Sequence, residues 1–392
     1  MITNDKVCYA SLFTDSKKTF LIFKGETISY QDFWKRVQSC KLDNQKYQLV
    51  CDEGVEFLVK YFAAVSRGHI AVCFNKESPK DYIRELCEGI DDFDVTLPIK
   101  HNKEGLDLYK TGPSTIIFTS GSTGRPKPIC LSHESFYFSA LGTNEFYNLD
   151  SSSNWAASLP FNHVGGLLIV YRMLLCQGSS TIFSPKYLAE QLRDSPQVTH
   201  ISVVATQLSR LLDDQELKEQ KRLEKLEGVI LGGAKCPFKL IKRATRRGVL
   251  LSNSYGQSET CAQVLATPLC LEAEVLKSVG QPLNYTQVSI ADDSCLVIRG
   301  DILCLDENYK KQDSIHTTDL AYKDDAGNFH IQGRKDEIFI SGGENISTQE
   351  IDEHILLSFE CVKSSKTFPI RNEVFSQVGQ SLIETSENIL YK

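Results

Sequence analysis

A nine-residue stretch, Thr119–Lys127, reads TSGSTGRPK and combines residue types that suit an anion. Gly121 and Gly124 allow unusual backbone angles, so that backbone N–H groups can approach a ligand closely. Four hydroxyl side chains add hydrogen-bond donors, and Arg125 and Lys127 supply positive charge. This composition indicates a phosphate-binding loop.

The alternative interpretation of the loop is an ordinary surface turn, since Gly, Ser, Thr and Pro are also common turn residues. The β-branched and aromatic run Ser114–Phe118 precedes the loop and predicts a strand that ends where the loop begins. Strand ends are where open α/β sheets bind ligands. The loop lacks the Gly-Lys-Ser/Thr ending of the common nucleotide P-loop, so another phosphate-binding family is indicated.

The overall composition is that of a large globular protein with no basic surface run. The chain has 392 residues, of which 41% are hydrophobic and 24% charged, and a net charge of −7. Nucleic-acid binding requires a basic surface, and the one basic run, Lys242–Arg247, has the spacing of a solvated helix face. We therefore expect no nucleic-acid partner.

Cysteine usage and the N-terminus favour a cytoplasmic location. The thirteen cysteines form no CxxC pair, and Met1–Lys6 lacks the apolar core of a signal peptide. The most apolar segment, Val164–Cys176, is too short to span a bilayer and contains Arg172. These features predict reduced thiols and no membrane span.

The order of periodic segments predicts an α/β fold. Strand-like runs alternate with amphipathic helical stretches, which indicates covered, mixed or parallel sheets in a large N-terminal domain. The predicted strands are Gln48–Cys51, His69–Phe74, Ser179–Phe183, His200–Val204 and Gly228–Leu231, and the predicted helices include Val55–Ser66, Tyr187–Arg193 and Thr206–Asp213. Short strands with turns then predict a small β subdomain at about residues 281–335.

Four further motifs follow the loop in the chain. They are Ser254–Thr260 (SYGQSET), His316–Asp319 (HTTD), Gly327–Asp336 and Ile340–Ile346. Each alone is typical of a turn or a cap. Together, in this order and spacing, they resemble the adenylate-forming superfamily of acyl-CoA synthetases, peptide-synthetase adenylation domains and luciferases.

This resemblance implies the domain organisation and the chemistry. It implies an AMP-binding adenylation domain at 1–335 and a partial α+β, mobile C-terminal domain at 336–392, with Asp336 as the hinge. In this superfamily a carboxylate attacks the α-phosphate of ATP to give an acyl-adenylate and pyrophosphate, and a thiol then displaces AMP. The implied cofactors and co-substrates are ATP, Mg²⁺ and CoA.

The resemblance also assigns the nucleotide residues. Lys127 is the countercharge of the leaving pyrophosphate, Glu259 binds magnesium, and Ser258 contacts the α-phosphate where Thr is usual. Tyr255, with Gly256 beside it, stacks on adenine, while Asp319 and Arg334 bind the ribose. The phosphate-loop residues are Thr119, Ser120, Gly121, Ser122, Thr123 and Gly124, and Gly233 and Ala234 lie beside the nucleotide.

The acyl site is implied by three further positions. His163, in the SLPFNHVGG segment, is similar to the family residue that gates this site, and Gly232 lies beside the acyl group. The stretches at Val203–Leu212 and Leu231–Pro237 resemble the o-succinylbenzoate-CoA ligases of menaquinone biosynthesis. Their substrate has a second carboxylate, which favours Arg210 as its partner. The alternatives are a structural histidine and an exposed helix arginine.

The C-terminal segment departs from the superfamily pattern. Cys361–Glu384 resembles the first part of the mobile domain, but the segment that carries the family's catalytic lysine is absent before Lys392. For these 392 residues we expect ATP binding, weak adenylation and little thioester product, because loss of one such electrostatic contact costs about 10²- to 10³-fold in rate.

The functional prediction is an ATP-dependent acid–thiol ligase that acts on o-succinylbenzoate. One alternative delivers the acyl group to a carrier protein instead of CoA, and another is a nucleotide-binding protein with little catalysis. The predicted partners are small molecules, namely the acid, ATP and CoA, with a homo-oligomer left open.

Overall fold

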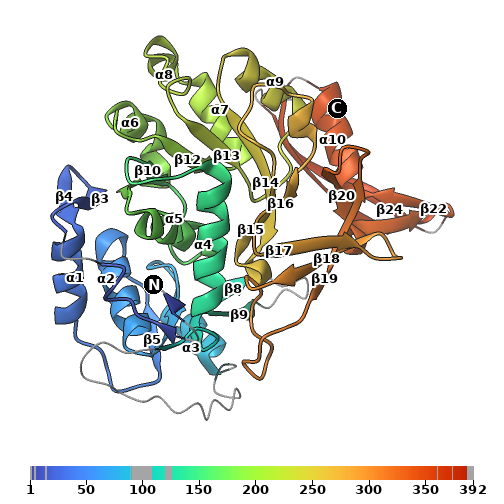
Figure 1. The fold of residues 1–392 in the computed structure, drawn as a ribbon. Coiled ribbons are helices and arrows are strands. Elements are labelled where there is room, and N and C mark those ends of the chain that lie inside the picture. The colour runs from blue at the N-terminus through green and yellow to red at the C-terminus, as the bar shows by residue number, and fades with distance from the viewer. Residues whose placement is uncertain are drawn as a thin grey trace.

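A computed structural model describes residues 2–3, 6–13, 16–88, 90, 108–119, 126–359, 361–372 and 374–385. Its largest element is a nine-stranded sheet in the order β16-β15-β14-β13-β12-β10-β11-β3-β4 (Figure 1). The strands are β3 (Thr19–Phe23), β4 (Glu26–Ser29), β10 (Asn154–Ala157), β11 (Ser179–Ile182), β12 (His200–Val203), β13 (Gly228–Leu231), β14 (Leu251–Gln257), β15 (Ala262–Ala266) and β16 (Gln281–Pro282). The strands from β3 through β11, β10, β12 and β13 to β14 are parallel, and antiparallel pairs close both edges. The predicted mixed α/β architecture is confirmed.

Helices cover both faces of this sheet. Along β10, Trp155 and Ala157 belong to one hydrophobic core and Ala156 to another, because successive side chains of a strand point to opposite faces. The helices of the first core are α1 (Tyr30–Ser39), α2 (Gly54–Ser66), α4 (His133–Tyr147) and α5 (Val164–Cys176). Those of the second are α6 (Leu188–Arg193), α7 (Ala205–Asp213), α8 (Gln215–Glu219) and α9 (Phe238–Arg246). A sheet covered on both faces explains why its parallel strands are short and apolar.

A second, four-stranded sheet supports the predicted phosphate loop. Its order is β5-β6-β8-β9. Its strands are β5 (Tyr47–Val50), β6 (Ile70–Cys73), β8 (Pro113–Thr119) and β9 (Lys127–Ser132), and α3 (Lys80–Glu88) lies between β6 and β8 in the chain. β8 and β9 pair antiparallel, with Thr119 opposite Lys127. The strand predicted before the loop is confirmed, whereas Ser120–Arg125 of the loop lie outside the described residues.

Smaller sheets complete the fold. The short strands β1 (Ile2–Thr3), β2 (Lys6–Val7) and β7 (Leu108–Tyr109) form one of them. The predicted small β subdomain is a four-stranded sheet of β17 (Thr286–Ile290), β18 (Cys295–Gly300), β19 (Ile315–Lys323) and β20 (Phe329–Arg334). Three 3-10 turns lie before it: η1 (Pro185–Tyr187), η2 (Ser258–Thr260) and η3 (Val275–Lys277).

The C-terminal part forms a sheet of its own. The 3-10 turn η4 (Lys335–Glu337) joins β20 to it, and its strand order is β22-β21-β24-β23. Its elements are β21 (Ile338–Ser341), β22 (Glu344–Ser347), α10 (Thr348–Ser358), β23 (Val362–Asn372) and β24 (Ser376–Thr385). This part projects from one side of the molecule (Figure 1). The predicted hinge, Asp336, therefore lies in the connection between two separate sheets.

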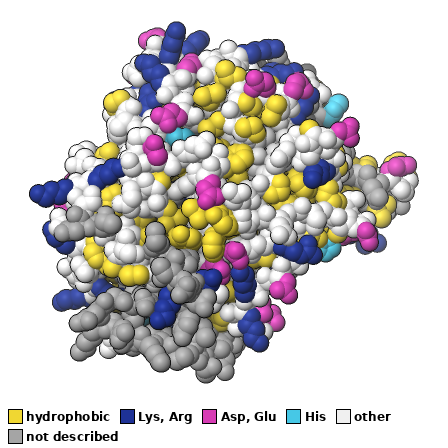
Figure 2. All heavy atoms as spheres, viewed as in Figure 1, with side chains coloured by type: hydrophobic (Ala, Val, Ile, Leu, Met, Phe, Trp, Pro, Cys, Tyr) yellow, Lys and Arg dark blue, Asp and Glu magenta, His cyan; other side chains and the backbone are white. Residues whose placement is uncertain are grey.

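The surface carries both signs of charge. On the face drawn in Figure 2, Lys and Arg side chains alternate with Asp and Glu side chains and form no continuous basic tract. Part of the basic run at residues 242–247 lies on α9, where Ile241 and Ala244 face the core and Arg243 and Arg246 are exposed. Within the described ranges, no helix combines the length and apolar character needed to cross a membrane.

Candidate functional site

The C-terminal ends of β12, β13 and β14 place the segments with family motifs along one edge of the large sheet. These strands are parallel neighbours, so the segments that follow them emerge on the same side. Ser254 in β14 donates a hydrogen bond to the carbonyl of Leu231 in β13 at 2.6 Å. The backbone N–H of Gly232 donates to the carbonyl of Val203 in β12 at 3.3 Å. Hydrogen bonds therefore link the C-terminal ends of β12, β13 and β14 to one another.

Two glycines at this edge have structural reasons to be glycine. Gly233 has φ of +82°, a conformation that other residues rarely adopt. A Cβ atom on Gly256 would overlap the carbonyl oxygen of Ala262, because β14 and β15 close tightly around η2. Gly233 thus allows a turn after β13, and Gly256 allows the close approach of β14 and β15.

A hydrogen-bonded network joins β14 to β19. The Tyr255 hydroxyl donates to Asp319 Oδ2 at 2.6 Å, and Gln257 Nε2 donates to the Tyr255 hydroxyl at 2.7 Å. Gln257 Nε2 also donates to Asp319 Oδ2. Burial, together with the nearby Asp319 carboxylate, raises the pKa of Tyr255, which keeps its hydroxyl protonated and able to donate.

The Asp319 carboxylate has one oxygen left for a ligand. Both network donors use Oδ2, and no described residue donates a hydrogen bond to Oδ1. Asp319 is 7% exposed, so the carboxylate is almost removed from bulk water. An acceptor held this way suits a hydroxyl donor such as those of a ribose.

Arg334 is opposite Asp319 in the β19–β20 pair but is engaged elsewhere. Its Nε and one terminal nitrogen donate to the two oxygens of Asp336 at 2.8 and 2.7 Å. This bidentate contact lowers the pKa of Asp336. The predicted sugar contact of Arg334 would therefore use its remaining donors or require the pair to open.

Lys127 and Glu259 lie in one neighbourhood, around Cys304. The backbone N–H of Cys304 donates to the carbonyl of Glu259 at 2.8 Å, and the next N–H, of Leu305, donates to Cys130 in β9 at 2.8 Å. Burial raises the pKa of the Cys304 thiol to about 11; the Glu259 carboxylate also raises it and the Lys127 ammonium lowers it. The predicted countercharge and metal ligand therefore act on the same thiol, although 132 positions separate them in the chain.

The Glu259 carboxylate is available for a cation. The side chain is half-buried in η2 and forms no hydrogen bond or ion pair with a described residue. Carboxylate and phosphate oxygens are the hard ligands that Mg²⁺ prefers. The residues present therefore fit a magnesium ion bound between Glu259 and phosphate groups.

His163 precedes α5 at the same edge of the sheet. It follows β10, which pairs in parallel with β12, and Ser158 Oγ donates to the carbonyl of Ser202 at 2.9 Å. The turn is tight, because a Cβ on Gly166 would overlap the carbonyl of Pro160. His163 is exposed, and partial desolvation of its ring lowers its pKa, which favours the neutral imidazole.

Arg210 lies on the exposed side of α7. Leu208, Leu211 and Leu212 are buried on the other side of this helix. The Arg210 guanidinium forms no ion pair with any described acidic residue, so it can receive an anion without breaking an existing contact.

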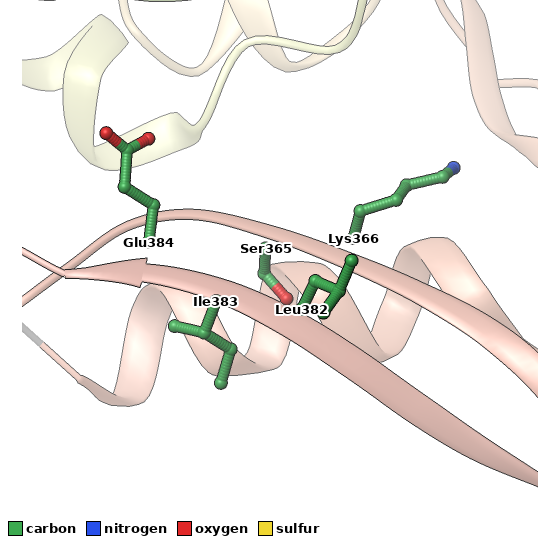
Figure 3. Close-up of a pocket in the computed structure, with 5 residues that line it drawn as sticks. All are labelled: Ser365, Lys366, Leu382, Ile383 and Glu384. Carbon is green, nitrogen blue, oxygen red and sulfur yellow. The ribbon is translucent and has the colours of Figure 1, made fainter. Parts of the chain in front are cut away.

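A pocket on the C-terminal hairpin is separate from these residues. It has a volume of about 340 Å³ and is lined by Ser365, Lys366, Leu382, Ile383 and Glu384 (Figure 3). All five belong to β23 or β24, and none is a predicted site residue. The candidate site is therefore the edge at β12, β13 and β14.

Sequence reasoning missed two contributors to this site. Gln257 stands two positions after Tyr255 in a strand, so the period of two already indicated that both face the same side. Cys304 had no local signal, because its place depends on a loop that crosses from β18 to β19. The loop Ser120–Arg125 lies outside the described residues, so only its flanks, Thr119 and Lys127, are placed.

Comparison with known families gives one match over more than half of the chain. A family model described as AMP-binding enzyme matches residues 91–302. The 2-succinylbenzoate–CoA ligase of Bacillus cytotoxicus is 27% identical over 97% of this chain and 86% of that protein. The protein of the same name from Bacillus mycoides is 30% identical over 70% of this chain and 60% of its own length.

Solved structures share the fold. The o-succinylbenzoate CoA synthetase (MenE) of Bacillus subtilis in complex with the acyl-adenylate OSB-AMP has a TM-score of 0.81 at 20% identity, with 97% of this chain and 88% of that chain covered. The same enzyme in complex with ATP and magnesium ion has a TM-score of 0.80 at 20% identity over 97% and 89%. Over nearly its whole length, this chain therefore has the adenylate-forming fold.

Proposed function

Because the chain belongs to the AMP-binding enzyme family, we propose that it is an acid–thiol ligase that activates o-succinylbenzoate with ATP and transfers the acyl group to CoA. The observation that carries the proposal is the convergence of Tyr255, Glu259 and Asp319 near one sheet edge, with Lys127 beside Glu259. Sequence relatives named 2-succinylbenzoate–CoA ligase support the choice of acid.

Lys127 and Glu259 would manage the phosphate charge. The Lys127 ammonium would balance the β- and γ-phosphates held by the loop from Thr119 to Gly124, and Glu259 would hold Mg²⁺, which neutralises charge on the phosphates. Ser258, adjacent to Glu259 in η2, would donate to the α-phosphate. The Lys127 ammonium and the Mg²⁺ held by Glu259 would together stabilise the negative charge that develops on the leaving pyrophosphate.

The nucleoside would bind across the end of β14. Asp319 Oδ1 would accept from ribose hydroxyls, while Oδ2 stays bonded to Tyr255 and Gln257. The Tyr255 ring would stack on adenine beside Gly256, and the exposed backbone at Gly233 and Ala234 would line the other side. Asp336, paired with Arg334, would be the hinge between the domains 1–335 and 336–392.

The acid would enter between α5 and α7. Gly232 would face the acyl group, and neutral His163 at the start of α5 would border it. Arg210 would pair with the carboxylate that does not react. A guanidinium without an ion-pair partner is suited to this, because it binds a carboxylate through two parallel hydrogen bonds.

The reaction has two steps. In the first, a carboxylate oxygen of the acid attacks the α-phosphorus of ATP, so that an acyl–oxygen–phosphorus bond forms and the bond to pyrophosphate breaks. In the second, the CoA sulfur attacks the acyl carbon, a thioester forms, and AMP leaves with the bonding electron pair. The thiol proton passes to solvent or to a nearby base.

The proposal includes a cytoplasmic location. ATP and CoA are available there, and reduced thiols are maintained. In the described structure none of the thirteen cysteines forms a disulfide, as expected in that compartment.

Pyrophosphate release tests the proposal. The full-length protein is assayed with ATP, Mg²⁺ and either o-succinylbenzoate or one of the two analogues that lack one carboxylate. We expect slow release with o-succinylbenzoate, weaker release with the analogue that lacks the unreactive carboxylate, and a small amount of CoA thioester by mass spectrometry when CoA is added, in keeping with the weak adenylation expected for these 392 residues. If a thioester forms with a loaded carrier protein but not with CoA, the proposal that CoA is the acyl acceptor is wrong. If the protein binds ATP but releases no pyrophosphate with any acid, the proposal that it is a ligase is wrong.

Arg210→Leu sharpens the choice of substrate. If Arg210 pairs with the second carboxylate, this variant should lose its preference for o-succinylbenzoate over the single-carboxylate analogue and retain the activity with that analogue. An unchanged preference would remove Arg210 from the site.

A further inference from the structure

Three side chains capable of binding a metal meet on the small β subdomain. Asp293 lies in the turn between β17 and β18, Cys295 begins β18, and His316 lies in β19. One possible ligand atom from each residue lies within 4.8 Å of the other two. The closest pair is Asp293 Oδ1 and His316 Nε2, at 3.1 Å.

His316 lies on the opposite face of β19 from Asp319, the proposed ribose contact, although the Cys295 thiol interacts electrostatically with the Asp319 carboxylate. In β19, His316 and Thr318 are exposed, whereas Thr317 and Asp319 are buried. Side chains alternate between the two faces of a strand, so His316 and Asp319 point to opposite sides of the sheet. A ligand at His316 would therefore not occupy the ribose position.

We propose that Asp293, Cys295 and His316 bind a divalent transition-metal ion, with Zn²⁺ as the ion that this donor set favours. Thiolate, imidazole and carboxylate are the three donor types of protein zinc sites, and Mg²⁺ prefers oxygen alone. Three protein ligands leave the fourth tetrahedral position to water. On binding, the Cys295 thiol releases its proton to solvent.

One of the three ligand–ligand distances is close to that of a tetrahedral site, and the other two are at most 4.8 Å. Zinc–nitrogen and zinc–oxygen bonds of about 2.0–2.1 Å place two such ligands about 3.3 Å apart. Asp293 Oδ1 and His316 Nε2 are 3.1 Å apart because they share a hydrogen bond. Binding of the metal through Nε2 replaces this hydrogen bond, and the ring proton then stands on Nδ1. Cys295 stands on the other strand of the β18–β19 pair, whose register shifts between Cys295 and Val297, and such bulges redirect side chains.

The existing contacts of Asp293 leave one oxygen directed at His316. Lys335 Nζ binds Oδ2 at 2.9 Å, whereas Oδ1 accepts from the Cys295 backbone N–H at 3.2 Å. A metal on Oδ1 keeps the Lys335 pair in place, and a carboxylate oxygen can accept a hydrogen bond while it coordinates. A cation at Oδ1 therefore keeps the Lys335 ion pair but replaces the contact between Oδ1 and His316, and the Cys295 thiol, which is 1% exposed, has to turn toward it.

Cobalt binding tests the proposal on the full-length protein after removal of metal by a chelator. Co²⁺ replaces Zn²⁺ and gives a thiolate-to-cobalt absorption band and strong visible bands in a tetrahedral site. We expect about one equivalent to bind with both signatures, Zn²⁺ to displace it, and Mg²⁺ to have no effect. Cys295→Ser should remove the thiolate band, and His316→Ala and Asp293→Asn should each weaken binding by at least about 10-fold.

Cys270→Ser is the matched control, because Cys270 is a partly buried cysteine outside the cluster. It should leave the band and the affinity unchanged, and the circular dichroism of every variant checks that the fold is retained. A cobalt spectrum without a thiolate band, the same band in Cys295→Ser, or no binding at about millimolar Co²⁺ would overturn the site. Because the readout is binding, the result is independent of the proposed ligase activity.

Discussion

The β14–β15 hairpin takes part in two tyrosine–glutamine pairs that differ in their surroundings: Tyr255 with Gln257 within β14, and Gln263 of β15 with Tyr147 at the end of α4. In the first, Gln257 donates to Tyr255, which donates to the Asp319 carboxylate. In the second, Gln263 donates to Tyr147 at 2.8 Å, and its oxygen faces the guanidinium of Arg172 at 3.4 Å. A tyrosine hydroxyl and a glutamine amide thus bind the Asp319 carboxylate in the first network, and the same two groups lie beside the buried Arg172 guanidinium in the second.

The two networks differ in the burial of their tyrosine and glutamine, because Tyr255 and Gln257 are only partly buried, although Asp319 is 7% exposed and thus as buried as the members of the second network. Tyr147, Gln263 and Arg172 are all less than 9% exposed, and Arg172 also lies over the Trp155 ring at 4.9 Å. Burial lowers the pKa of Arg172 to about 10. In the Asp319 network, one carboxylate oxygen accepts no hydrogen bond from a described residue. The Arg172 network is enclosed but not fully paired, because Arg172 Nε is buried without a hydrogen-bond partner among the described residues. The Asp319 network instead keeps its unpaired oxygen at the candidate site, where a ligand can use it.

The largest effect on the reaction is expected from Glu259→Gln, in the candidate site beside the Asp319 network. The amide has no negative charge to hold Mg²⁺, so the rate of pyrophosphate release should fall by about 10²- to 10³-fold. The free energy of unfolding should change by less than about 1 kcal/mol, because the carboxylate has no hydrogen-bonded partner among the described residues. Single-turnover assays and thermal denaturation measure the two effects. An unchanged rate would remove Glu259 from the reaction.

Acid should destabilise the protein through His200, which lies beside the enclosed Arg172 network. Burial lowers the pKa of His200, which stacks on Trp155, to about 4 from an ordinary value of 6.5. The folded state therefore favours the neutral ring, and stability should be lost as the pH falls from about 6.5 to about 4, by about 3 kcal/mol at the lower end. Urea denaturation between pH 7 and pH 4 measures this. In His200→Gln the slope over this range should be smaller, and an equal slope would assign the loss to other groups.

The two tyrosines provide a matched comparison. Tyr147→Phe leaves Gln263 Nε2 without its acceptor in the core and should destabilise the protein by about 1–3 kcal/mol, with KM for ATP unchanged. Tyr255→Phe removes a donor to a charged group that a ligand would share. It should raise KM for ATP by several-fold or more and change stability by less than Tyr147→Phe does. Equal stability losses in both variants would contradict the distinction between the Asp319 network and the enclosed Arg172 network.

The smallest effect is expected at the surface pair of Arg334 and Asp336. Arg334 lowers the pKa of Asp336, so the pair contributes stability above the unfolded pKa of about 4 and loses it as the pH falls through the lower folded value. Both side chains are more than a third exposed, so the contribution should be below about 1 kcal/mol. Asp336→Asn should thus have nearly the same melting temperature at pH 7. A larger kinetic change in thioester formation would support its role as the hinge.

Much of the fold was predictable from local patterns. The strands before the phosphate loop and along the large sheet follow from short apolar, β-branched runs, and α7 follows from leucines at helical spacing. The resemblance of the Ser254–Thr260 and His316–Asp319 motifs to the adenylate-forming superfamily suggested Tyr255, Glu259 and Asp319 as site residues, and their roles stay predictions. Helix and strand periods act over a few residues, so a single sequence contains them in full.

The partners of those residues were decided only by the tertiary structure. Tyr255 and Asp319 are 64 positions apart, and Tyr147 and Gln263 are 116 apart. Nothing in the local spacing separates Gln257, which faces the site, from Gln263, which faces Arg172. Likewise, Asp293 and Cys295 meet His316 only because β18 pairs with β19 in one particular register. The sequence by itself determined which groups are available and which periods they follow. Strand order and register, set by burial of both sheet faces, decided which of these groups became neighbours.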